Sequence, residues 1–81
     1  MKDYQGAADI YKNLYESTND FAAGYNYATM LQILYHFDEA EELYKKLQEV
    51  NPKDNNLKNA IKRFPEDKAN YEILKSRNQV Q

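Results

Sequence analysis

The 81-residue chain contains no cysteine and no tryptophan, a single histidine, two glycines and two prolines. Without cysteine it can form neither a disulfide framework nor a thiolate metal site. A zinc or iron site would have to be built almost entirely from carboxylates, and the acidic residues lack the spacing of a calcium-binding EF-hand loop. Because the two glycines are isolated, no phosphate-cradling loop exists. We therefore expect neither a metal nor another cofactor.

Long apolar runs, basic blocks and catalytic constellations are also missing. No stretch approaches the roughly 18 to 20 apolar residues of a membrane-spanning helix, so we expect no membrane insertion. The formal net charge is −2, which argues against nucleic acid as a partner, because phosphate neutralisation dominates that affinity. Neither a nucleophile beside a base, an acid–base pair nor a metal cluster can be assembled, so we expect no enzyme. No signature of an oxidising compartment is present, which favours the cytoplasm.

What the sequence does contain is a set of apolar residues at helical spacing. In residues 3–17 they fall on one face of a helix, and 33 positions later the same face returns in a helix predicted to end near residue 50. The two sets are Tyr4, Ala7, Ile10, Tyr11 and Leu14, and Phe37, Ala40, Leu43, Tyr44 and Leu47. Five matching positions at one offset indicate an internal repeat, and a period of this length is typical of a helical solenoid.

The intervening helix, predicted over residues 21–34, follows the same offset. Its packing face corresponds to a similar face in a helix predicted over 54–64. The two faces are Gly24, Tyr27, Ala28 and Leu31, and Leu57, Ala60, Ile61 and Phe64. Glycine lowers helix propensity by up to about 1 kcal/mol relative to alanine, so we expect a neighbouring helix to approach closely at Gly24.

Cap and turn residues separate these segments. Asn19 or Asp20 is expected to cap the second helix, and Asp38, with Glu41 three residues later, to cap the third. Asn51-Pro52 should end the third helix, because proline disfavours helical geometry in the residue before it.

Residues 21–54 resemble one tetratricopeptide repeat, and residues 3–17 resemble part of another. The family pattern is W-x2-L-G-x2-Y, then A-x3-F, then P. The corresponding places are held by Gly24, Tyr27, Ala28, Leu31, Ala40, Tyr44 and Pro52. Gly24 replaces the leading tryptophan and Tyr27 the leucine, so packing within the repeat differs from the family's usual packing. The resemblance implies an all-α fold of antiparallel helix pairs, stacked as a short right-handed superhelix, and a role in binding other proteins.

We therefore expect a single helical domain over residues 1–81 with about five helices. Residues 3–17 would be the second helix of a partial repeat, 21–54 a full repeat and 54–64 the first helix of a further repeat. Proline suits the first position of a helix, so Pro65 predicts a divergent capping helix over 65–78. Residues 79–81 would form a frayed tail.

The resemblance also implies a binding surface on the concave side of the stack. Its candidate residues are Tyr25, Asn26, Thr29, Gln32, Lys58, Asn59 and Lys62. A tyrosine floor, amide donors and two lysines one turn apart would suit an extended or helical peptide that carries acidic groups. The expected function is thus a protein-interaction module or scaffold without catalysis.

A second function is a structural subunit that assembles with itself. A repeat cannot bury its apolar face alone, and about three repeats are normally needed. Ile10 and Tyr15 on the first helix lack a repeat to cover them. The exposed end helices would then pack on other copies or on partner subunits, unless the chain is part of a longer array of repeats.

Overall fold

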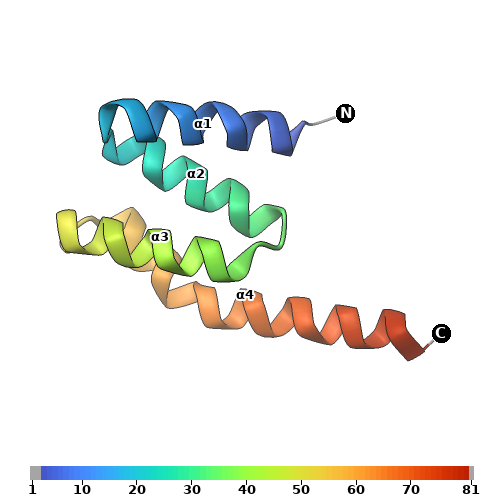
Figure 1. Ribbon diagram of the computed structural model, residues 1–81. Coiled ribbons are helices and arrows are strands. Elements are labelled where there is room, and N and C mark those ends of the chain that lie inside the picture. The colour runs from blue at the N-terminus through green and yellow to red at the C-terminus, as the bar shows by residue number, and fades with distance from the viewer. Residues whose placement is uncertain (1–2, 81) are drawn as a thin grey trace.

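The computed structural model describes residues 3–80, and within them the side chains of residues 3–77. This part of the chain contains four helices and no strand: α1 (Tyr4–Thr18), α2 (Phe21–Ile33), α3 (Phe37–Val50) and α4 (Asn55–Val80). Each helix runs antiparallel to the one before it and packs on it, so that α1 and α4 lie at opposite ends of the stack (Figure 1). The all-α fold class is therefore confirmed. None of the described helices is long and apolar enough to cross a membrane.

Aspartate caps start three of the four helices. The carboxylates of Asp3, Asp20 and Asp54 accept hydrogen bonds from backbone N–H groups three residues later, at 2.8, 3.1 and 2.9 Å. These bonds satisfy donors that have no partner inside the helix. The cap predicted at Asp38 is wrong, because α3 begins after His36, whose side chain makes no capping bond. Asp38 lies in the first turn instead, where the helix dipole favours an acidic side chain.

The core is centred on α3, which lies between α2 and α4. All five residues of its repeat face are at most 7% exposed. They are Phe37, Ala40, Leu43, Tyr44 and Leu47. From α4, the Phe64 ring packs edge-on against Phe37 and Tyr44, with ring centroids 5.7 and 6.0 Å apart. Aromatic pairs in this geometry add stability beyond the area they bury.

The equivalent face of α1 is much more open. Ile10 is 67% exposed, Leu14 45% and Tyr4 37%, although each corresponds to a buried residue of α3. The difference arises because, in the described chain, α1 has its main contact with one helix, α2, whereas α3 packs on both α2 and α4. The expectation that Ile10 lacks a cover is confirmed, but the same expectation for Tyr15 is wrong, since Tyr15 packs against the core.

Gly24 lies where α1, α2 and α3 meet. A Cβ atom at this position would be 2.7 Å from Cε1 of Tyr15 on α1 and 2.9 Å from Cδ2 of Leu47 on α3. Such distances are shorter than van der Waals contact, so only glycine fits without movement of its neighbours. The close approach predicted from the sequence is confirmed, and it comes from two helices at once.

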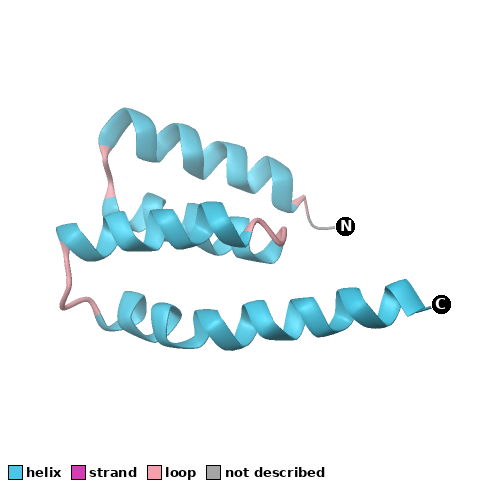
Figure 2. Ribbon diagram, turned by 60° about the horizontal axis from the view of Figure 1, so that its bottom comes forward, coloured by secondary structure: helices cyan, strands magenta, loops and turns pink. Residues whose placement is uncertain are grey.

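The C-terminal part of the chain differs from the prediction. Pro65 lies inside α4, which continues without interruption as one helix of 26 residues (Figure 2). The separate capping helix over 65–78 is therefore wrong. Phe64 and Tyr71 both pack on the Phe37 ring, at 5.7 and 5.3 Å between centroids, so burial on either side of the proline offsets the backbone hydrogen bond that it removes. Residues 79 and 80 belong to α4 rather than to a tail, and Gln81 lies outside the described residues.

Candidate partner-binding groove

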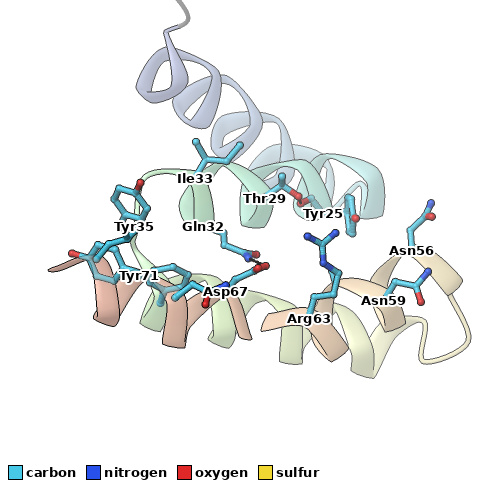
Figure 3. Close-up of a pocket in the computed structure, with 14 residues that line it drawn as sticks. Tyr25, Thr29, Gln32, Ile33, Tyr35, Asn56, Asn59, Arg63, Asp67 and Tyr71 are labelled. Atoms are coloured by element: carbon cyan, nitrogen blue, oxygen red, sulfur yellow. Dashed lines mark hydrogen bonds between the residues drawn. The ribbon is translucent and has the colours of Figure 1, made fainter. Parts of the chain in front are cut away.

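A groove with a volume of about 510 Å³ lies between α2 and α4. From α2, the turn after it and the first residue of α3, the lining side chains are Tyr25, Thr29, Gln32, Ile33, Tyr35 and Phe37. From α4 they are Asn56, Asn59, Ala60, Arg63, Asp67, Asn70, Tyr71 and Leu74. On each helix these residues recur every three or four positions, so each helix presents a single side to the groove. Figure 3 shows the labelled side chains facing one another across the gap.

A chain of two hydrogen bonds crosses the floor of the groove and ties three helices together. The Tyr44 hydroxyl on α3 donates to Oε1 of Gln32 on α2 at 3.0 Å, and Nε2 of Gln32 donates to Oδ2 of Asp67 on α4 at 2.6 Å. Burial raises the pKa of the Tyr44 hydroxyl above its ordinary value, which keeps it a neutral donor. A hydrogen bond to an ionised acceptor is about twice as strong as a neutral one. The Gln32–Asp67 bond therefore holds the two walls of the groove at a defined separation.

One end of the groove is aromatic. The rings of Tyr35 and Tyr71 stack with their centroids 4.5 Å apart and 20° between their planes, and they lie together in Figure 3. Tyr35 adopts a φ of 67°, a left-handed conformation that is rare for a bulky residue. Strained backbone of this kind is often found at functional sites. Ile33 and Leu74 beside the stack are 39% and 53% exposed, so this end offers accessible apolar surface.

The other end is polar and contains Arg63, the only Lys or Arg among the described residues that line the groove. Arg63 extends from α4 toward Thr29 and Tyr25, with Asn56 and Asn59 beyond it (Figure 3). The ion pairs among the described side chains are Lys45–Glu41 and Lys68–Asp38, so the Arg63 guanidinium has no acidic partner there. A free guanidinium offers five donors in a fixed fork that matches a carboxylate.

Four of the seven candidate residues named from the sequence line this groove: Tyr25, Thr29, Gln32 and Asn59. Asn26, Lys58 and Lys62 do not. The 33-residue offset carries the groove-lining residues of α2 onto positions 58, 62, 65 and 66 of α4, whereas α4 lines the groove with another of its sides, which includes Asn59, Arg63 and Asp67. Lys62 precedes Arg63 by one residue, which is about 100° around the helix.

The residues that the sequence reasoning missed are on α4 and on the turn before α3. They include Tyr35, Asn56, Arg63, Asp67, Asn70, Tyr71 and Leu74. Their recurrence along α4 every three or four residues is visible in the sequence. It could not be assigned to a groove until the side of α4 that faces α2 was known.

No cluster of three or more His, Asp or Glu side chains able to hold a metal occurs in the described part of the chain. Comparison of the sequence and structure with protein-family models, curated proteins and solved structures gave no significant match.

Proposed function

We propose that this chain is a tetratricopeptide-like interaction module that holds an extended segment of a partner protein in the groove between α2 and α4, without catalysis. The proposal is supported by the antiparallel helices, the two helix pairs related by a 33-residue offset, and the open groove that they form. The observation that carries it is the unpaired Arg63 guanidinium in a groove whose opposite end is a tyrosine stack.

This arrangement defines the chemistry of the partner. The guanidinium favours a carboxylate, either an acidic side chain or a chain terminus, in a bidentate hydrogen-bonded pair. Asn56 and Asn59 carry amides that can donate to and accept from a peptide backbone. At the other end, the exposed surfaces of Tyr35 and Leu74 can cover an apolar side chain, since tyrosine is a preferred residue at binding hot spots.

The spacing of the two ends sets the register of the segment. Arg63 and Tyr71 are eight residues apart on α4, which corresponds to about 12 Å along the helix axis. An extended peptide advances about 3.3 Å per residue. The partner segment therefore carries an acidic residue and an apolar residue about four positions apart.

Binding of fluorescently labelled peptides, measured by anisotropy, tests this function. The probe is an octapeptide with Asp at one position and Leu four residues away, compared with the same peptide carrying Asn for Asp. Arg63→Glu should weaken binding of the Asp peptide by at least about tenfold, equivalent to about 1.4 kcal/mol. Lys62→Glu is the matched control, because it makes the same charge change on the same helix at a residue that does not line the groove. Equal losses from both variants, or none from Arg63→Glu, would refute the assignment.

A self-assembling subunit is the second candidate function. The observation that favours it is the exposure of Ile10 and Leu14 on α1, at 67% and 45%. This surface is separate from the groove, so the two functions are compatible and can be tested independently.

A further inference from the structure

The groove between α2 and α4 is lined by two charged side chains of opposite sign. They are Arg63 and Asp67, and the lining includes no other Lys, Arg, Asp or Glu among the described residues. In the proposed function, Arg63 pairs with an acidic residue of the partner, and the stack of Tyr35 and Tyr71 covers an apolar one. Asp67 lies between these two points (Figure 3), so a bound segment passes over its carboxylate.

The carboxylate of Asp67 is only partly satisfied within the molecule. Its Oδ2 atom accepts a hydrogen bond from Nε2 of Gln32 at 2.6 Å, but the amide is neutral and leaves the charge uncompensated. Neither ion pair among the described side chains involves Asp67, and its Oδ1 atom has no side-chain partner there. An ionised carboxylate can accept about four hydrogen bonds. Asp67 can therefore accept from a ligand while it keeps its bond to Gln32.

The spacing along α4 matches the repeat of an extended peptide. Arg63, Asp67 and Tyr71 all line the groove, and successive members of this row are four residues, or about 6 Å, apart along the helix axis. Side chains on one side of an extended peptide recur every second residue, which is about 6.6 Å. Alternate residues of an extended segment in the groove can therefore face Arg63, Asp67 and Tyr71 in turn.

We propose that the groove selects extended partner segments with a basic residue midway between the acidic and the apolar residue, and that Asp67 recognises this basic residue. The inference rests on the proposed function and adds a third position to it. The acidic residue faces Arg63, a Lys or Arg of the partner faces Asp67, and the apolar residue faces the tyrosine stack. Because the basic position is midway, the pattern is the same for either direction of the segment.

The two groove charges together narrow the range of partners. Arg63 alone would favour any acidic segment, but a second acidic residue midway along the segment would face the like charge of Asp67. Binding sites gain specificity from such repulsion as well as from attraction. A Lys or Arg at that position instead donates a charge-assisted hydrogen bond to the free oxygen of Asp67. Segments with alternating charges are therefore preferred over uniformly acidic ones.

Fluorescence anisotropy with a set of labelled octapeptides tests the inference. Each peptide carries Asp and Leu four residues apart, with Lys, Gln or Glu midway between them. The wild type should bind the Lys peptide about fivefold more tightly than the Gln peptide, and the Glu peptide about fivefold less tightly, since partly exposed charge pairs have modest energies. Asp67→Asn retains an oxygen that accepts from Gln32, so the groove walls stay linked. This variant should bind all the peptides within about twofold of one another.

Glu66→Gln is the matched control, because it removes a negative charge next to Asp67 at a residue that does not line the groove. It should keep the wild-type preference, and circular dichroism checks that both variants fold. Equal binding of the Lys, Gln and Glu peptides by the wild type would overturn the inference, as would an unchanged preference in Asp67→Asn.

The proposed function is judged separately, by the preference for Asp over Asn at the peptide position that faces Arg63. If the wild type keeps that preference while it binds the Lys, Gln and Glu peptides equally, only the inference fails. If the preference for Asp is absent, the proposed function fails and the inference fails with it.

Discussion

Replacing Gln32 by glutamate tests the hydrogen-bonded link that holds the walls of the groove. The substitution keeps the shape of the side chain but exchanges the Nε2 donor for a carboxylate oxygen, 2.6 Å from Oδ2 of Asp67. At neutral pH both groups are ionised. The variant therefore loses a donor and gains a like charge at the same point.

The expected loss of folding stability follows from these two changes. A hydrogen bond to a charged group contributes about 1.5 to 3 kcal/mol, and two like charges about 4 Å apart repel by about 1 kcal/mol in the high dielectric of an open groove. We expect Gln32→Glu to lower the free energy of unfolding by about 2.5 to 4 kcal/mol at neutral pH. For a domain of this size, that corresponds to a fall in melting temperature of about 10 to 30 °C.

The pH dependence supplies the diagnostic result. Two carboxylates that share a site raise the pKa of one of them above the ordinary value of about 4. The folded variant then binds more protons than the unfolded chain, so its stability falls as pH rises from about 4 through the raised pKa. The loss of stability relative to wild type should therefore be small near about pH 4.5 and complete near about pH 7.5.

Urea denaturation followed by circular dichroism measures this deficit. Gln32→Met is the control, because it removes the amide without adding a charge and should give a deficit that does not change with pH. If Gln32→Glu loses the same stability at both pH values, or no more than Gln32→Met at neutral pH, the Gln32–Asp67 link is refuted.

Four further predictions concern stability and can be measured by the same denaturation experiment. Gly24→Ala should destabilise by about 1 kcal/mol, because displacing two neighbours costs more than the gain in helix propensity. Gly6→Ala should change stability by less than about 0.5 kcal/mol, since that gain offsets the loss of the Asp3 cap. Pro65→Ala should stabilise by about 1 to 2 kcal/mol by restoring a helix hydrogen bond, and a loss of stability would contradict this. The raised pKa of Tyr44 makes wild-type stability fall as pH rises above about 10; Tyr44→Phe should show a shallower decline, with Tyr27, whose pKa burial also raises, accounting for part of the remainder.

Local signals in the sequence predicted the first three helices well. The apolar spacing and the cap residues Asn19 and Asp20 placed both ends of α1 and α2, and the apolar spacing with Asn51-Pro52 the end of α3, within about one residue of the observed ends, which is better than such boundaries usually allow. The prediction for Gly24 succeeded because glycine destabilises a helix, and close approach of a neighbouring helix is one of the few reasons to find it there. These features depend on residues that are near one another in the chain.

The failures have a different origin, since they depend on packing between distant residues. Pro65 is a strong local signal for a helix start, but the aromatic contacts of Phe64 and Tyr71 with Phe37 keep α4 continuous across it. The offset that identified the repeat selected Lys58 and Lys62, which lie outside the groove, because α4 lines the groove with a different side from the one that corresponds to the groove-lining side of α2. The sequences of α1 and α3 also have similar apolar patterns. Ile10 is exposed and the equivalent Leu43 is buried, because the two helices have different numbers of neighbouring helices.

The length of α4 has a mechanical consequence. At about 1.5 Å per residue, its 26 residues span about 39 Å, while the 13 residues of α2 span about 20 Å. The C-terminal turns of α4 thus act as a lever arm on the part that forms the groove. The compliant point is near Pro65, where a backbone hydrogen bond is missing. Tension applied to the C-terminal turns should therefore change the width of the groove, and occupation of the groove should stiffen α4 against bending.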